Sequence, residues 1–198
     1  FEGVLWKDSF LSGELLLMHL YINETMSDSH NDRDDVVIDG VYWTKTIPSL
    51  EKNSVYDVYF LNFRNMDFLG SGNSLASYNN IGLRFNGQKG NFALESELTL
   101  QNSSGTSSKN NVSASLFSFN LGYKPTGTRF LNSVFLGLDR ISGDDSSTET
   151  AEGFSKEFGA RHKHHGFYDY TDHKKYFGHG HDGLNEICLL YTSPSPRD

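Results

Sequence analysis

Apolar and polar residues alternate with a period of two through most of this chain. In residues 91–101, NFALESELTLQ, one side carries Phe92, Leu94, Leu98 and Leu100, while acidic and small polar residues occupy the other side. Successive side chains of a β-strand point to opposite faces, whereas a helix repeats every 3.6 residues. The pattern therefore predicts strands, each with one apolar and one polar face.

The alternation and its apolar variants predict eight strands in sequential order. Two of them, 13–25 and 53–65, are apolar on both faces. Arg64 lies in the second of these strands, so the sequence does not tell on which face its side chain lies. Short links are expected at 8–12, 48–52, 88–89 and 125–128, and long polar links at 26–35, 66–75, 103–111 and from 142 onward. The predicted strands span 1–7, 13–25, 36–47, 53–65, 80–87, 91–101, 112–124 and 129–140.

Short links at one end of the strands and long links at the other are typical of an outer-membrane barrel. The strands are about ten residues long, enough to cross a hydrocarbon core at a tilt. We therefore expect an all-β fold, an antiparallel up-and-down transmembrane β-barrel of which about eight strands are present. A soluble β-sandwich also alternates, but its strands are usually shorter, near five or six residues.

Charge and hydropathy exclude several classes of protein. The formal net charge is −8, which argues against nucleic-acid binding, because that function needs a basic surface. The longest apolar run, residues 15–22, contains His19 and is far too short for a spanning helix of about 20 residues. No arrangement of residues predicts a catalytic centre or a cofactor site.

Two stretches resemble the bacterial outer-membrane alginate-export porin family. They are NIGLRFNGQKGNFALESELTLQ, residues 80–101, and FLGLDRISGDD, residues 135–145, which continues into the His-rich segment. The strand that ends in a Ser-Gly-Asp turn, followed by a long outer loop, is the family's pattern. The resemblance covers residues 1–187 in order and assigns the motif positions to Ser142, Gly143, Asp144, His162, Gly166 and Asp169.

The resemblance implies a monomeric barrel in the bacterial outer membrane, in contact with its lipid. Family members have eighteen strands, so residues 1–187 are expected to be part of the C-terminal half, with 142–187 as a long outer loop. The resemblance implies passive passage of an anionic or polar solute, with an alginate-like polyuronate as one candidate. A general porin for small polar solutes and a soluble β-domain that binds metal or carbohydrate are the alternatives.

The last eleven residues, CLLYTSPSPRD, differ from everything before them. They contain the only cysteine and two of the four prolines of the chain. All eleven can be written in codons that resemble the read-through of a transposase-type sequencing-library adapter. We therefore expect residues 188–198 to be an adapter-derived artefact and exclude them from functional reasoning.

A porin's selectivity depends on the charges that line its lumen. If the apolar faces point to lipid, five charged residues are candidates for the lumen: Arg64, Arg84, Arg129, Glu95 and Glu97. The family conducts a polyanion along an arginine-rich lumen, whereas these candidates are mixed in sign. Arg84 can equally pair with Glu95 or Glu97 across the hairpin and brace the wall.

Two polar segments carry residues that bind metals in other proteins. Six of the eight histidines lie between His162 and His181, but without the spacing of a zinc hydrolase. The segment 27–35, SDSHNDRDD, lacks the glycine and closing glutamate of an EF-hand loop. We expect outer loops rather than metal sites at both places, and no metal.

Overall fold

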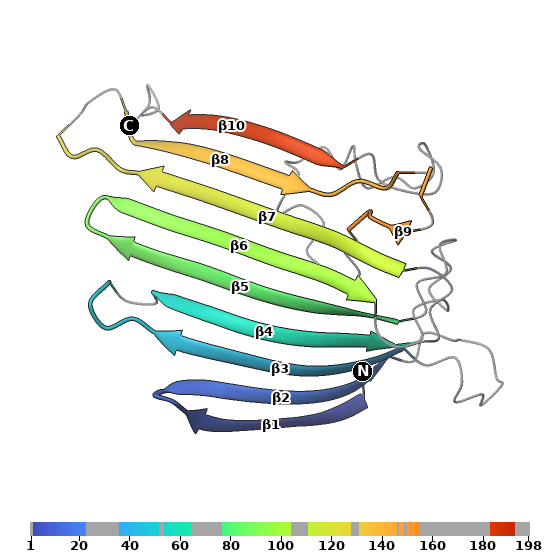
Figure 1. The fold of residues 1–198 in the computed structure, drawn as a ribbon. Helices are drawn as coiled ribbons and strands as arrows, with labels where there is room; N and C mark the ends of the chain where they lie inside the picture. The colour runs from blue at the N-terminus through green and yellow to red at the C-terminus, as the bar shows by residue number, and fades with distance from the viewer. Residues whose placement is uncertain are drawn as a thin grey trace.

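The computed structural model describes residues 2–22, 36–51, 54–64, 77–103, 111–127, 131–145, 147–148, 150–154 and 183–192. Within these ranges the chain is all-β, and nine strands lie side by side in chain order in one antiparallel sheet (Figure 1). A further short strand, β9, pairs with β7 in parallel. The strands are β1 Glu2–Phe10, β2 Gly13–Ile22, β3 Val36–Thr46, β4 Val55–Arg64, β5 Ser77–Lys89, β6 Phe92–Ser103, β7 Asn111–Tyr123, β8 Ser133–Ile141, β9 Thr150–Ala151 and β10 Leu184–Thr192.

The prediction of an all-β, antiparallel, up-and-down sheet is confirmed. Strands β1 to β8 are the eight strands expected from the alternation, and the sheet they form is consistent with part of a barrel. Strand β10 was not expected. It begins at Leu184, so residues 184–187 belong to a strand rather than to the end of the predicted loop, and it continues to Thr192 alongside β8. The origin of residues 188–198 stays a prediction.

Two tight turns lie at one end of the strands, on the left of Figure 1. Leu11 and Ser12 join β1 to β2, both with positive φ (48° and 61°), which matches the twist of a two-residue hairpin. Gly90 (φ 56°) and Asn91 join β5 to β6. This turn lies two residues beyond the predicted one at 88–89. A shift of two residues leaves every side chain on its expected face.

The strands' two ends differ as predicted, though not strictly. The tight turns and the connections 47–54 and 124–132 lie at what we call the tight-turn end. The connections 23–35, 65–76, 104–110 and 142–183 join the strands at the other end, which we call the long-connection end. The alternation in length has an exception, because the connection 104–110 is shorter than 124–132.

One face of the sheet, which we call the apolar face, carries large exposed hydrophobic side chains. A row of register partners on this face runs through Leu17, Val41, Phe60, Ile81 and Leu100. These side chains are 36–49% exposed, and exposure reaches 79% at Ile187 on β10. Such a surface is much larger than the scattered apolar residues that ordinary soluble proteins expose.

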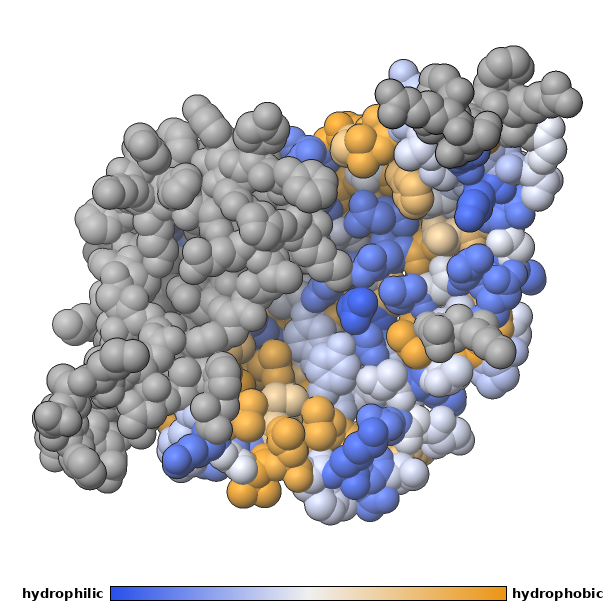
Figure 2. Space-filling view, turned by 180° about the vertical axis from the view of Figure 1, so that it is seen from behind, coloured by the Kyte–Doolittle hydropathy of each residue, from blue (hydrophilic) through white to orange (hydrophobic). Residues whose placement is uncertain are grey.

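The opposite face, which we call the polar face, carries hydrogen-bonding and charged side chains over β4 to β8. Buried members include Asp57, Thr99, Gln101 and Ser118. Figure 2 shows this face, with hydrophilic side chains gathered over the middle of the sheet. The sheet therefore has an apolar and a polar side, as the alternation of the sequence predicted.

Candidate functional site

Two stacked tyrosines lie at the centre of the polar face. The rings of Tyr42 on β3 and Tyr59 on β4 are parallel, with centroids 5.4 Å apart. The Tyr59 hydroxyl lies 2.9 Å from Glu97 Oε1 and 2.6 Å from Thr99 Oγ1 on β6. Because a phenol has a single O–H, Tyr59 donates to the carboxylate and accepts from the threonine. These bonds reach across β5, which separates β4 from β6.

The Tyr59 ring crosses β5 where that strand carries Gly82. A Cβ atom built on Gly82 would lie 2.0 Å from Tyr59 Cζ, so no larger residue fits without moving the ring. Tyr59 is itself 8% exposed. The glycine therefore lets the Tyr59 ring lie flat against strand β5 and extend to β6.

Arg84 on β5 lies between two carboxylates. Its Nη2 donates to Glu95 Oε1 at 3.3 Å, and its Nη1 lies 3.6 Å from Asp57 Oδ2. The expectation that Arg84 braces the wall by pairing across the hairpin is confirmed for Glu95. Glu97, the other predicted partner, is bound by Tyr59 instead. Arg84, Glu95 and Glu97 do share one face, as predicted.

Further polar pairs continue the network toward β8. Ser118 donates to Asp139 Oδ1 at 2.6 Å, and the side-chain amide of Gln101 donates to Asn80 at 3.0 Å. These groups form a hydrogen-bonded wall. Among the described residues, no group of three or more His, Cys, Asp or Glu side chains is arranged to hold a metal ion.

Arg64 does not share the face of Arg84, in contrast to the expectation that both lie on the same side of the sheet. It ends β4 on the same side as Phe60, because side chains of equal parity in a strand share a face. Its guanidinium pairs with Asp39 on β3, 2.5 Å away, and Asp39 also contacts His19 on β2. Arg64 is therefore part of a charged group at the long-connection end of the apolar face.

Three asparagines continue this charged group across the next strands. The side-chain amide of Asn62 donates to Asn79 at 2.7 Å, and that of Asn79 donates to Asn102 at 3.2 Å. We call the whole row the polar belt; it consists of His19, Asp39, Asn62, Arg64, Asn79 and Asn102. Sequence reasoning missed it, although its residues have the parity of the apolar positions in their own strands.

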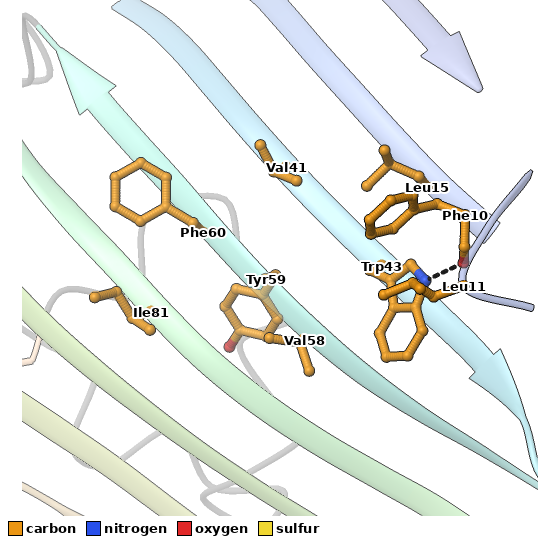
Figure 3. A pocket seen from close by; sticks show the side chains of 9 residues that line it. All are labelled: Phe10, Leu11, Leu15, Val41, Trp43, Val58, Tyr59, Phe60 and Ile81. Carbon is orange, nitrogen blue, oxygen red and sulfur yellow. Dashed lines mark hydrogen bonds between the residues drawn. The ribbon is translucent and has the colours of Figure 1, made fainter. Parts of the chain in front are cut away.

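Aromatic side chains lie at the tight-turn end of the apolar face. Trp43 and Tyr56 meet edge to face at 5.3 Å, and Phe92 and Tyr123 lie 4.8 Å apart. Figure 3 shows an open hollow here, where Trp43 Nε1 donates to the Phe10 carbonyl at 2.8 Å. We call Trp43, Tyr56, Phe85, Phe92 and Tyr123 the aromatic belt. The apolar face thus has an aromatic belt at one end and a polar belt at the other.

The Ser-Gly-Asp motif after β8 turns the chain back over the polar face. Ser142 Oγ accepts from the Ser115 amide at 2.8 Å and donates to the Glu152 carbonyl at 2.6 Å. Asp144 Oδ1 accepts from the Glu152 amide at 2.9 Å. The returning segment places Phe154 in a buried cluster with Ala114, Leu116 and Ile141, which belong to the polar face.

The residue after the motif is an anion that the backbone stabilises. The Ser147 amide donates to Asp145 Oδ1 at 2.9 Å, and together with the Ser147 side chain it lowers the pKa of Asp145. The lowered pKa keeps this carboxylate charged at more acidic pH than an ordinary aspartate. The hydrogen bonds of Ser142 and Asp144, on either side of Gly143, thus hold the return turn in place.

Replacing Ser142 with alanine is expected to loosen this return turn by about 1–2 kcal/mol, because two hydrogen bonds lose their common partner. Hydrogen exchange of the Ser115 and Phe154 amides should accelerate by roughly 5–30-fold. Thr126→Ala, at an exposed position of the tight-turn end, is the control and should leave both rates unchanged. Unaltered exchange in the Ser142 variant would show that the hydroxyl does not hold the turn.

Several predicted positions lie outside the described residues. They are the lumen candidate Arg129, the family-motif residues His162, Gly166 and Asp169, the His-rich segment 162–181, and the acidic segment 27–35. The described part of the predicted site is therefore Arg84 with Glu95 and Glu97 on the polar face, Arg64 on the apolar face, and the turn at residues 142–144.

The described strands thus form one sheet with two chemically distinct faces. None of the described segments is a helix of the length and apolarity that crossing a membrane requires. Comparison of the chain with family models, with curated proteins and with solved structures finds no match.

Proposed function

We propose that this chain forms part of the wall of a bacterial outer-membrane porin that gives polar solutes passive passage. The observation that carries the proposal is the exposed apolar face. Leu83 and Leu98 lie side by side near its middle and are 52% and 42% exposed. Water is a poor solvent for such a surface, whereas hydrocarbon chains of lipid accommodate it without cost.

The apolar residues follow an oblique path across the strands, which supports a tilted wall. The row of paired residues that starts at Val41 in β3 reaches Ser115 in β7. In β7 the large apolar side chains lie nearer the tight-turn end, at Phe117, Phe119 and Leu121. Barrel strands tilt by about 35–45° from the axis, so a band parallel to the membrane crosses the rows obliquely.

The two belts support the same orientation. Aromatic side chains gather at membrane interfaces, where one part of the ring meets lipid and another meets polar groups. The aromatic belt, with Trp43 and Tyr56, lies at the tight-turn end, which would be periplasmic in a barrel of this kind. The polar belt at the long-connection end would then meet the head groups of the outer leaflet.

The polar face would line the passage. The buried Tyr59, together with Thr99, holds the partly exposed Glu97 in a fixed position, so a hydrated solute would meet a rigid polar wall. Passage of this kind needs no catalytic residue and no cofactor. A general porin for small polar solutes is the second candidate, because Arg84 is engaged by carboxylates and is not displayed toward a polyuronate.

A soluble β-domain would have to cover the apolar face with another layer of protein. Detergent dependence separates the two classes of protein. We expect the full-length gene product that contains residues 1–187 to stay monodisperse only in detergent or lipid. A monodisperse product in detergent-free buffer would contradict the membrane proposal.

Electrical recording in a planar lipid bilayer tests passage directly. We expect the purified full-length protein to insert and produce discrete conductance steps, because the polar face would enclose water. A polyuronate added on one side should reduce the ionic current if it enters the passage. Current that is unaffected at either polarity would favour the general porin, and the absence of any conductance would overturn the proposed function.

A further inference from the structure

On the polar face, negatively charged residues outnumber positively charged ones. Among the described strands this face carries six carboxylates and two cations, an excess of four negative charges. The cations are Lys7 and Arg84. The carboxylates are Glu14, Asp57, Glu95, Glu97, Asp139 and Glu186.

Both cations are already paired with carboxylates of the same face. Lys7 Nζ lies 2.7 Å from Glu14, and Arg84 contacts Glu95 and Asp57. A pair of opposite charges in contact produces a weak field at a distance, so neither cation can attract an anion strongly. Three carboxylates remain, on β6, β8 and β10, and the group of Arg84 with Asp57 and Glu95 keeps one further net negative charge.

Two of the remaining carboxylates are held in place by neutral donors. Glu97 accepts from the Tyr59 hydroxyl, and Asp139 accepts from the Ser118 hydroxyl. A hydroxyl donor stabilises a carboxylate without cancelling its charge. These two carboxylates therefore hold their negative charge on the polar face, at positions that hydrogen bonds restrict.

We infer that the passage lined by this face selects cations over anions, and that cationic or neutral polar solutes are its substrate class. This inference rests on the proposed function. Walls of low dielectric concentrate the field of fixed charges in the water that they enclose. A local potential of about 1 kT already changes the ratio of univalent cations to anions by roughly sevenfold. A polyanion such as alginate would be repelled by the same field.

A salt gradient across a planar bilayer that contains the full-length protein tests the inference. The reversal potential in potassium chloride gives the permeability ratio of potassium to chloride, which we expect to exceed about 3. A ratio below one would overturn cation selectivity while leaving the porin proposal intact. Absence of channels would overturn the porin proposal and the inference with it.

Two substitutions identify the carboxylates responsible. Glu97→Gln and Asp139→Asn each remove one charge but keep an oxygen that accepts the hydroxyl hydrogen bond, so folding should be preserved. We expect the double variant to lower the permeability ratio by about twofold or more. Glu2→Gln, on the apolar face of β1, removes the same charge and is the matched control. An equal effect of the control would show that the polar face does not set selectivity.

Discussion

Replacement of Leu98 by arginine is expected to prevent stable insertion of the protein into a membrane. Leu98 lies within the apolar face, between Leu83 on β5 and Phe117 on β7. An arginine that faces lipid in a barrel costs about 2–4 kcal/mol near the bilayer midplane, where the guanidinium has lost its hydration. That cost is comparable with a large fraction of the stability of a typical domain.

The measurement is the folded fraction of the full-length protein after refolding into lipid vesicles. Asn86→Arg is the matched control, because Asn86 is exposed on the polar face of the neighbouring strand β5. The control should insert like the unmodified chain, since its arginine would meet water. If Leu98→Arg inserted equally well, the apolar face would not be in contact with lipid, and a soluble sheet would be the better description.

The sequence predicted the faces of the sheet well, because parity within a strand survives small errors in its ends. The turn between β5 and β6 was placed two residues early, yet Phe92 and Glu97 kept their predicted faces. Arg64 was the exception. Its strand has apolar residues of both parities, among them Tyr59 and Phe60, so hydropathy alone does not tell which of its sides belongs to the apolar face.

Apart from the Arg84–Glu95 pair across the β5–β6 hairpin, contacts between side chains on different strands were not predicted from the sequence. The polar belt joins six residues from five strands, and its pairing depends on the register of each strand with its neighbour. The same holds for Phe154, which is buried against β7 and β8 only because the Ser142 turn returns the chain over them. Strand β10 was missed because its first residues were assigned to a long polar loop and the rest to a tail.

Because Tyr59 packs on Gly82, the effect of a Gly82 substitution on stability should change sign with the presence of the tyrosine ring. Gly82→Ala is expected to destabilise the protein by about 1–3 kcal/mol, the usual cost of overpacking. The new Cβ would be 2.0 Å from the Tyr59 ring, which its hydrogen bonds to Glu97 and Thr99 keep from moving aside. Without the clash, alanine in a strand should be about 0.5–1 kcal/mol better than glycine, because glycine loses more backbone entropy on folding.

A double-mutant cycle separates these two effects. In a Tyr59→Ala background the ring is gone, so Gly82→Ala should become neutral or stabilising, and the coupling between the two positions should exceed about 1 kcal/mol. Urea unfolding of the full-length protein in lipid or detergent provides the free energies. Equal effects of Gly82→Ala in the two backgrounds would show that the glycine is not there to receive the tyrosine. A coupled pair would show that the network of Tyr59, Glu97 and Thr99 requires a backbone without a side chain at position 82, in the strand that the tyrosine must cross.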